Sequence, residues 1–282
     1  MDEQKKKKRR KRWILCLAAA LLLGGYLYWQ DNDLMQTGYT CESPDIPEAF
    51  DGYRIVQISD LHNKWWGKDQ ERMMEAIQAA QPDIIVLTGD IMDGNRPKVE
   101  PAARFCEQAV KLAPVYYVSG NHEMLAEYSY RRELFDRMHA CGVIFMLNRN
   151  VELTRNGASI TLSGLESIQK ADYFALKQIS DAETDFVVLL EHNPADAEAF
   201  LQSDADLTLT GHTHGGQFRF PLIGGLYAPD QGILPEYDGG AFYGNGHMLI
   251  VNRGAGNSGF PFRVGNRPEI VTVTLRHVEG GA

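Results

Sequence analysis

Short apolar runs alternate with helix-like segments through most of this 282-residue chain. Residues 53–59, 84–88 and 115–118 are such runs, and each has the length and composition of a buried strand. The segments between them, such as residues 68–81, carry apolar residues at helical spacing. Strands joined by helices indicate sheets that helices bury, which is an α/β architecture. A chain of this length can hold one large α/β domain or two small ones.

A polar motif rich in histidine or carboxylate follows several of the strand-like runs. Five of the eight histidines fall in four such motifs, and a fifth motif supplies carboxylates. The motifs are Asp60-Leu61-His62, Gly89-Asp90-Ile91-Met92-Asp93, Gly120-Asn121-His122-Glu123, Glu191-His192-Asn193-Pro194 and Gly211-His212-Thr213-His214. In α/β folds ligands bind at the carboxyl ends of strands, so we expect these motifs to meet there. Because imidazole and carboxylate bind first-row divalent metals, the pattern predicts a metal site.

Taken alone, each motif also has a structural explanation. A single histidine after a strand, such as His62, is more often a hydrogen-bonded structural residue than a metal ligand. An aspartate in the position of Asp90 is often only the cap of the next helix. Together the motifs are more informative, because a carboxylate can place one oxygen on each of two metals. Asn121 offers a neutral oxygen ligand, which leaves the adjacent His122 to reach the substrate.

The N-terminus joins a basic run to an apolar one. Residues 1–12 contain eight Lys and Arg against two acidic residues, and no charge appears between Arg12 and Asp31. As a helix, residues 13–29 would span roughly 25 Å at about 1.5 Å per residue, near the lower limit for crossing a bilayer. The positive-inside rule then places the N-terminus in the cytoplasm and the chain after Asp31 outside. The alternative is a cleaved signal peptide, although no convincing Ala-x-Ala cleavage site follows the apolar run.

Charge and cysteine content restrict the function further. The whole chain has a net charge of −9, and because residues 1–12 carry +6, the other 270 residues carry −15. An acidic domain binds nucleic acid poorly, since affinity for the phosphate backbone comes mainly from Lys and Arg. Cys41, Cys106 and Cys141 lie outside the apolar segment that holds Cys16. Their odd number and scattered spacing predict buried free thiols rather than disulfides or a zinc site.

The order of the five motifs resembles that of the calcineurin-like metallophosphoesterase superfamily. Within it, the chain is similar to the bacterial membrane-anchored branch. The likeness runs from about Pro47 to Leu275 and includes the phrase from Thr210 to Gln217. It implies a two-sheet β-sandwich flanked by helices, preceded here by one transmembrane helix. The implied domains are a basic cytoplasmic segment (1–12), an anchor (13–29), a tether (30–50) and a catalytic domain (51–278).

The resemblance also implies two divalent metal ions, for which manganese, iron and zinc are all candidates. The first metal would be bound by Asp60, His62, His214 and the shared Asp90. The second metal would be bound by Asp90, Asn121, His192 and His212. His122 would not be a ligand, and would instead stabilise phosphate charge or protonate the leaving oxygen. Glu123 or Asp93 would orient the ligands.

The implied function is a phosphodiesterase or phosphatase at the outer face of the cell membrane, in which a metal-bridging hydroxide attacks phosphorus in line. Its partners would be the lipid bilayer and a phosphoester or pyrophosphate substrate, without nucleic acid or an obligate protein partner. One alternative is hydrolysis of a lipid-linked pyrophosphate such as UDP-diacylglucosamine, which relatives of this branch hydrolyse. An alternative of another class is a catalytically weak metal-binding scaffold at the membrane. A missing ligand or a missing His122 would favour the scaffold, and neither is missing.

Other polar and aromatic residues have two explanations each. Trp65 and Trp66 follow the first motif, where they would either grip a lipid or nucleoside or pack in the core. Arg253 and Arg263 would either clamp a substrate phosphate or form structural salt bridges. The remaining histidines are expected to be structural or exposed, and they are His139, His247 and His277.

Overall fold

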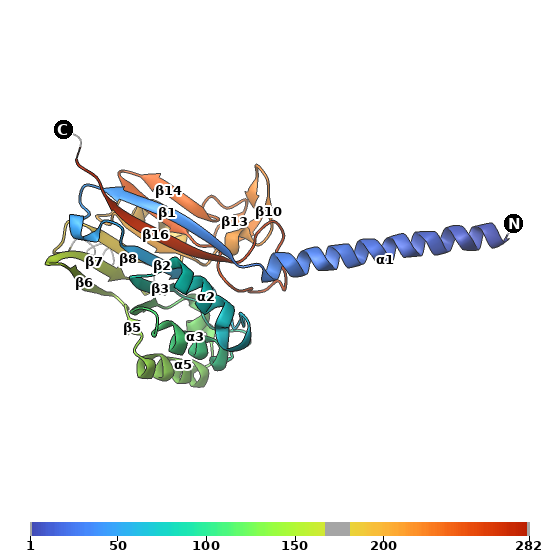
Figure 1. Cartoon of the computed structure of the whole chain (residues 1–282), viewed down its shortest axis with the longest axis horizontal. Helices are drawn as coiled ribbons and strands as arrows, with labels where there is room; N and C mark the ends of the chain where they lie inside the picture. Colours follow the sequence, from blue (N-terminus) through green and yellow to red (C-terminus); the bar gives the residue numbers. More distant parts are fainter. Residues whose placement is uncertain (1, 167–180, 281–282) are drawn as a thin grey trace.

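Two six-stranded sheets pack face to face in the computed structural model, which describes residues 2–166 and 181–280 (Figure 1). Helices cover the outer face of the first sheet, and a long N-terminal helix extends away from the domain (Figure 1). The predicted fold class, a β-sandwich flanked by helices, is confirmed.

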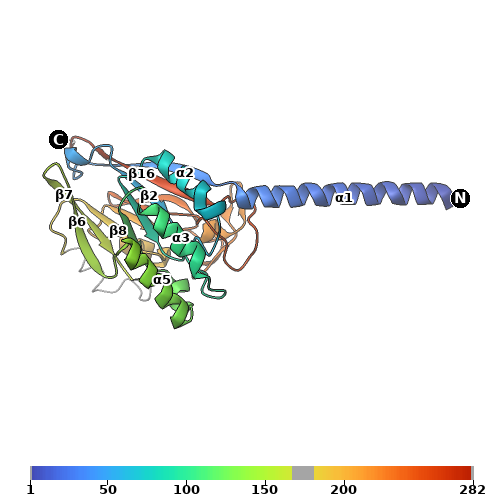
Figure 2. The same ribbon diagram turned by 60° about the horizontal axis from the view of Figure 1, so that its bottom comes forward.

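The first sheet has the strand order β1-β16-β2-β3-β4-β5. Its strands are β1 (Met35–Ser43), β2 (Arg54–Ile58), β3 (Ile84–Thr88), β4 (Val115–Val118), β5 (Ile144–Phe145) and β16 (Glu269–His277). Strands β2 to β5 run parallel, whereas β16 is antiparallel to β2. The helices that connect the parallel strands lie on one face of this sheet, as Figure 2 shows, and they are α2 (Glu71–Ala80), α3 (Val99–Ala109) and α5 (Tyr128–Cys141).

The second sheet has the strand order β14-β15-β9-β8-β7-β6. Its strands are β6 (Arg149–Arg155), β7 (Ala158–Gly164), β8 (Val187–Leu190), β9 (Leu207–Thr210), β14 (Gly240–Gly244) and β15 (His247–Val251). Two short hairpins lie between β9 and β14 in the sequence. They pair β10 (Arg219–Phe220) with β11 (Gly224–Gly225), and β12 (Tyr227–Ala228) with β13 (Gly232–Ile233).

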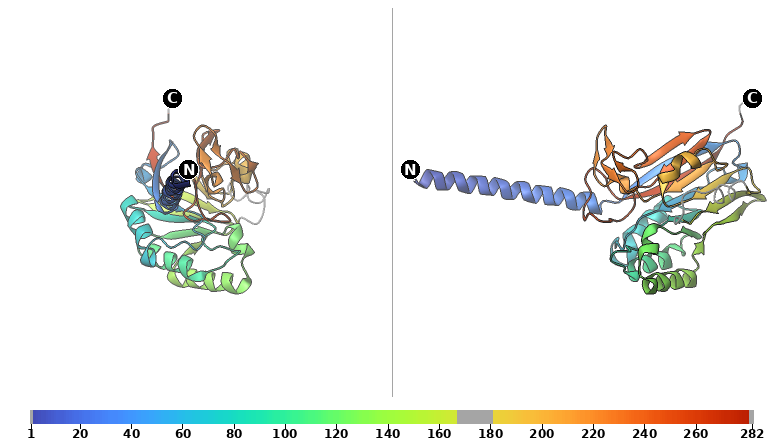
Figure 3. Two further views of the ribbon diagram at one scale, coloured as in Figure 1. Left: turned by 90° about the vertical axis from the view of Figure 1, so that its right-hand side faces the viewer. Right: turned by 180° about the vertical axis from the view of Figure 1, so that it is seen from behind.

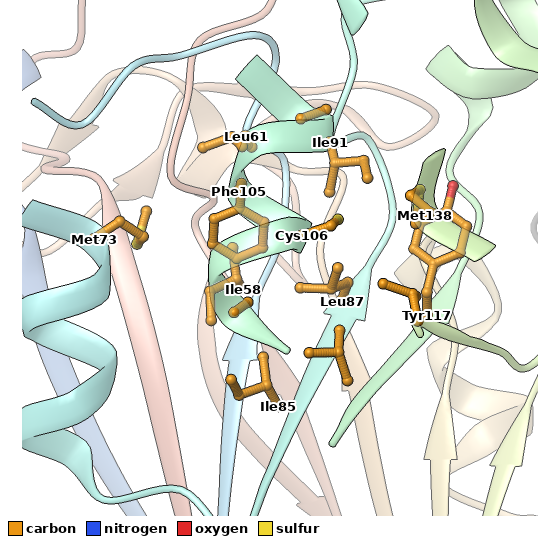
Figure 4. Packing of buried hydrophobic residues seen from close by; sticks show 14 of the residues in the cluster. Ile58, Leu61, Met73, Ile85, Leu87, Ile91, Phe105, Cys106, Tyr117 and Met138 are labelled. Atoms are coloured by element: carbon orange, nitrogen blue, oxygen red, sulfur yellow. The ribbon is translucent and has the colours of Figure 1, made fainter. Parts of the chain in front are cut away.

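Alternation of side chains along the first sheet divides its apolar residues between two layers. In β3, Ile84 and Val86 belong to the layer between the sheets, whereas Ile85 and Leu87 belong to the layer beneath the helices. Figure 4 shows the second of these layers, where Phe105 of α3 lies over the strands. Burying a side chain of this size stabilises the fold by about 1.5–3 kcal/mol. The two layers therefore hold the strand ends, and the polar motifs that follow them, in fixed positions.

Residues 30–50 differ from their prediction, because they contain strand β1 rather than only an irregular tether. β1 pairs in parallel with β16 along its whole length, from Met35 opposite Glu269 to Ser43 opposite His277. The segment has no apolar run, so its local pattern does not indicate a strand. Backbone pairing with β16 at the edge of the sheet determines its structure instead. The sequence pattern also predicts a helix over residues 171–181, and all of these residues except residue 181 lie outside the described part of the chain.

The N-terminal helix α1 (Asp2–Asn32) is one continuous element that includes both the basic run and the apolar run. By length and composition it is able to cross a membrane. Its C-terminal end is bonded to the domain. The backbone N–H of Asn266 donates to Gln30 Oε1 at 3.2 Å, and Arg267 forms an ion pair with Asp33 just beyond the helix.

Candidate metal centre

The five sequence motifs meet at one edge of the sandwich, where parallel strands of both sheets end. Asp60 and His62 follow β2, Asp90 follows β3, Asn121 and His122 begin α4 (Asn121–Leu125) after β4, His192 follows β8, and His212 and His214 follow β9. Among the predicted ligands, Asp60, His62, Asp90, His212 and His214 have φ between +43° and +68°. Such backbone costs of order 1–3 kcal/mol per residue, and it persists where the surroundings impose it, most often at functional sites.

Three of the predicted ligands form a first buried cluster. His62 Nε2 lies 3.1 Å from His214 Nε2. Asp60 Oδ1 lies 3.5 Å from His214 Nε2 and 3.8 Å from His62 Nε2. All three side chains are buried, and their ligand atoms lie within 4.8 Å of one another. Burial lowers the pKa of His214 well below its usual value, and this favours the neutral imidazole that a metal requires.

The other predicted ligands form a second cluster around His192. Its Nε2 lies 3.2 Å from Asp90 Oδ2, 3.1 Å from Asn121 Oδ1 and 3.1 Å from His212 Nδ1. Each of these neighbours comes from a different loop, so the cluster exists only in the folded chain. The structure therefore brings all seven predicted ligands together in two adjacent groups.

Asp90 lies between the two clusters. Its Oδ2 is 3.2 Å from His192 Nε2 in one and 3.7 Å from His62 Nε2 in the other. Its Oδ1 accepts a hydrogen bond of 2.8 Å from the backbone N–H of His122. The expectation that each oxygen would serve a different metal stays a prediction, and the contacts of the two oxygens differ. One oxygen faces both clusters, because the other is held by the backbone of α4.

The second cluster has the donor set of a cation site. The Nδ1–H of His192 donates to the carbonyl of Thr88 at 2.7 Å, which leaves the lone pair of Nε2 facing the cluster. The Nε2–H of His212 donates to Asp230 at 3.0 Å, which leaves the lone pair of its Nδ1 facing the same point. With the oxygens of Asp90 and Asn121, four acceptor atoms converge. A divalent cation satisfies such a set, so the residues present fit a metal.

The electrostatics of His192 agree with this assignment. Burial by itself disfavours the charged imidazolium, yet Asp90, Asp60 and the Thr88 carbonyl together outweigh burial and raise the pKa of His192 to about 10. The site therefore stabilises positive charge at Nε2. A divalent cation that binds there displaces a proton, because the ligand must be neutral.

His122 lies beside the two clusters but has different partners. Its Nδ1 accepts a hydrogen bond of 3.0 Å from the backbone N–H of Gly94, so the neutral ring carries its proton on Nε2. That Nε2 lies 3.3 Å from Ser258 Oγ. Burial lowers the pKa of His122, which favours the neutral form. Although His122 is near enough to His62 and Asp90 to join a metal group, a ring with a fixed Nε2–H is better suited to donate a proton.

The carboxylate of Glu123 bonds to the backbone of the loops that carry the clusters. It accepts hydrogen bonds of 2.9 Å from the backbone N–H groups of Asp90, Met92 and Gly120. These bonds fix the ends of β3 and β4 relative to each other, so Glu123 acts on the backbone of a predicted ligand rather than on its side chain. Asp93 instead lies 3.5 Å from His122 Nδ1.

Two glycines of the motifs leave room for carboxylates. A Cβ at Gly120 would lie 2.1 Å from Asp90 Oδ1. A Cβ at Gly211 would lie 1.9 Å from Ser59 Oγ and 2.5 Å from Asp60 Oδ2. Any other residue at these positions would displace a predicted ligand, and this explains why each motif begins with glycine.

A cavity of about 370 Å³ opens in front of the clusters. Its floor includes Asp90, Asn121, His122, His212 and His214. Its lining also includes the apolar and aromatic residues Tyr227, Pro229 and Phe260. A substrate that enters the cavity would thus place a polar group on the floor and an apolar group against these residues.

The structure decides between the two explanations of several other residues. Trp66 is fully buried in the core, whereas Trp65 is 44% exposed. Arg263 is buried, donates to the carbonyl of Arg253 at 2.7 Å and lies 3.4 Å from His214 Nδ1. It therefore packs behind the first cluster and does not line the cavity, which corrects its candidate role as a phosphate clamp. Arg253 forms an ion pair of 3.6 Å with Glu269, as the structural explanation predicted.

The remaining histidines and cysteines lie outside the site. His139 is exposed and stacks on Phe145, and His247 is buried against Thr208. The Nδ1 of His277 bonds to the carbonyl of Ile46. All four cysteines are free thiols, as expected. Cys41 and Cys106 are buried, but Cys141 is only partly buried, because it lies in the last turn of α5 next to Gly142.

Asp230 was not identified from the sequence. It lies in the Gly- and Pro-rich segment after β9, where it accepts hydrogen bonds from His212 Nε2 at 3.0 Å and from Asn193 Nδ2 at 2.9 Å. The sequence offers only a turn-like Pro229-Asp230 pair as a signal. A carboxylate that fixes the tautomer of a metal-binding histidine is a common outer partner in metal sites.

Comparisons with known proteins agree with this geometry. A family model described as calcineurin-like phosphoesterase matches residues 53–216. The chain is 31% identical over 269 residues to the uncharacterized metallophosphoesterase YkuE of Bacillus subtilis, with 90% of each chain covered. It is 26% identical over 266 residues to an uncharacterized metallophosphoesterase of Aquifex aeolicus, covering 90% of this chain and 96% of that protein. It is also 26% identical over 250 residues to a transmembrane protein with metallophosphoesterase domain from Danio rerio, covering 82% of this chain and 55% of that protein.

Proposed function

This chain belongs to the calcineurin-like phosphoesterase family and is a metal-dependent phosphoester hydrolase, and on this basis we propose that it hydrolyses phosphodiesters or phosphomonoesters with two divalent ions at the outer face of the cell membrane. Manganese, iron or zinc fits the ligand types. The ligands of the first ion would be Asp60, His62, His214 and Asp90. The ligands of the second ion would be Asp90, Asn121, His192 and His212.

One observation carries the proposal: acceptor atoms from separate loops converge at His192, with Asp90 Oδ2 facing both clusters. A scaffold that only bound metal would not require His122 in the cavity lining with its proton fixed on Nε2. The arrangement of His122 therefore favours an enzyme over the scaffold alternative.

The chain's own residues supply positioning and proton transfer. Two divalent ions held by the seven predicted ligands would supply an activated water as the nucleophile and neutralisation of charge on the phosphoryl oxygens. The Nε2–H of His122 donates to an oxygen of the phosphoryl group or of the leaving group, and the N–H of Gly94 keeps the proton on that nitrogen. Tyr227 and Phe260 hold the apolar part of the substrate and exclude water from the cavity.

The substrate class is tested with the full-length protein purified in detergent and loaded with each metal in turn. We expect hydrolysis of aryl phosphodiesters or phosphomonoesters, and the same protein assayed with excess chelator should be inactive. A lipid-linked pyrophosphate such as UDP-diacylglucosamine belongs in the same panel, because the apolar part of the cavity lining favours it as a second candidate. If no phosphoester or pyrophosphate is cleaved with any metal, the proposed activity is wrong.

The membrane location rests on α1. The eight basic residues of its first part predict a cytoplasmic N-terminus and an outer catalytic domain. Gln30 at the end of α1 and Asp33 just beyond it bond to Asn266 and Arg267 of the domain, so the helix is packed against the domain where it leaves it, which supports a retained anchor. The Danio rerio relative is likewise named a transmembrane protein.

The orientation gives a separate prediction. Alkaline phosphatase fused after Ala282 should be active, because that enzyme folds only where disulfides form. A fluorescent protein that matures only in the cytoplasm, fused at the same position, should be dark. The opposite pair of results would reverse the topology.

A further inference from the structure

The two hairpins after β9 expose an unusual number of large apolar side chains. Six of them form a surface that we call the apolar rim: Phe220, Leu222, Ile223, Leu226, Ile233 and Leu234. Leu222 is fully exposed, and 76% of Ile233 is exposed. No charged residue occurs from Phe220 to Pro229. A cluster of exposed apolar side chains on an otherwise acidic domain indicates a surface that contacts an apolar partner, such as a protein or a membrane.

The apolar rim is held in place by the fold. The N–H of Leu226 donates to the carbonyl of Phe218 at 2.8 Å, and the N–H of Leu234 donates to the carbonyl of Leu226 at 2.9 Å. The carboxylate of Asp238 accepts a hydrogen bond from the N–H of Gly225 and forms an ion pair of 2.9 Å with Arg219. These bonds fix the hairpins, so the apolar side chains are presented outward by an ordered backbone.

The apolar rim lies at the end of the domain from which α1 emerges. Figures 1 and 3 show β10 and β13 beside this end, on the side of the domain that faces along α1. A short chain of contacts connects them. Asn266 bonds to Gln30 of α1, and two residues away Val264 accepts a hydrogen bond of 2.8 Å from Arg219 at the start of β10. The position of the apolar rim relative to the anchor is therefore fixed.

We propose that the apolar rim rests in the surface of the lipid bilayer that α1 spans, so that the catalytic domain contacts the membrane at a second place. The bilayer is the occupant that the contacts favour, because the rim continues the surface at which the anchor leaves the domain. Trp65 supports this location. It is half-exposed, and the neighbouring Lys64 bonds to Asp31 at the end of α1. Tryptophan prefers the membrane interface, and apolar side chains with few charges enter it.

The position of the apolar rim next to the cavity restricts the class of substrate. Tyr227 and Pro229 line the cavity from the β12–β13 hairpin, and Phe260 lines it from the loop before β16. The cavity therefore opens beside the proposed membrane contact. This inference rests on the proposed function, and it narrows the substrate to a phosphoester that carries a lipid tail. The tail would remain in the bilayer while the phosphoester reaches the clusters.

The contact is tested by fluorescence quenching in the full-length chain. Leu222→Cys is labelled with an environment-sensitive maleimide in a Cys16→Ser, Cys141→Ser background and reconstituted in phosphatidylcholine vesicles. Cys41 and Cys106 are retained because they are buried, and burial raises the pKa of the Cys41 thiol to about 12, so neither should react. Lipids with a nitroxide near the headgroup should quench the label at least about twofold, since a side chain at the interface lies within 5–10 Å of that depth.

The matched control is Glu152→Cys, an exposed position on β6 at the end of the domain opposite α1 (Figure 1). It should be unquenched. Absence of quenching at residue 222 in a vesicle-bound protein would overturn the membrane contact and leave the anchor intact. A finding that another protein covers the apolar rim would also overturn the membrane contact. A protein that does not remain with the vesicles at high pH would contradict the anchor as well. Leu222→Asp should lower hydrolysis of a vesicle-embedded phosphoester several-fold while leaving a soluble aryl substrate unaffected, and equal rates on both would contradict the substrate assignment.

Discussion

Asp90→Ala should abolish metal binding at both clusters and reduce kcat by at least about three orders of magnitude. A side-chain oxygen of Asp90 faces both groups of predicted ligands, at 3.2 Å from His192 and 3.7 Å from His62. Its loss leaves the first cluster with Asp60 as its carboxylate and the second cluster with no carboxylate among its predicted ligands. The ions contribute several kcal/mol to transition-state stabilisation, and about 4 kcal/mol corresponds to a thousandfold change in rate.

The measurement is metal content by elemental analysis together with activity on an aryl phosphodiester. Circular dichroism and thermal unfolding verify that the variant is folded, because Asp90 also accepts the N–H of His122. Asp136→Ala is a matched control, since Asp136 is exposed on α5, where it forms an ion pair of 3.6 Å with Arg132. Two retained metals and unchanged turnover in folded Asp90→Ala would refute the site.

The elements that the sequence predicted well are those whose residues carry their own signal. β3 and β4 occur at their predicted residues, 84–88 and 115–118, because each is a strong apolar run that ends at a turn. β1 has no such signal, and its structure comes from pairing with β16, which lies more than two hundred residues away. The hairpins after β9 are similar, since their strands have only two residues each and their positions depend on Asp238 and Arg219.

In the candidate site, the ligands were predictable from the sequence, but the residues that position them were not. The seven expected ligands converge because each ends a strand, and strand ends meet at one edge of a sheet. Residues that act on the ligands carry no comparable signal. Asp230 lies in an irregular segment, and its role depends on the position of His212 Nε2. The different contacts of the two Asp90 oxygens were also not predictable, because they follow from the path of the backbone at the start of α4.

His122→Ala is expected to keep both metals and to lower kcat by about 10²–10⁴, the usual contribution of a positioned acid or base. The ring lies at the cavity floor with its Nδ1 held by Gly94, so its removal should take away a proton donor without disturbing the clusters. Elemental analysis measures whether both metals are retained, and loss of metal from His122→Ala would show that His122 is a ligand. His139→Ala provides the control, since His139 is exposed on α5.

Leaving-group dependence separates the two roles open to His122. If its Nε2–H protonates the leaving oxygen, the defect of His122→Ala should be large for an alkyl ester, whose alkoxide leaves poorly, and small for a nitrophenyl ester, whose phenolate needs no proton. If His122 instead stabilises charge on the phosphoryl oxygens, the defect should be similar for both esters, because that charge is present in each transition state. The tautomer fixed by Gly94 permits either role, since in both the donor is the same Nε2–H. The ratio of the two defects therefore shows which oxygen receives the hydrogen bond or proton from His122. If His122→Ala hydrolyses both esters at the wild-type rate, His122 has no role in the mechanism.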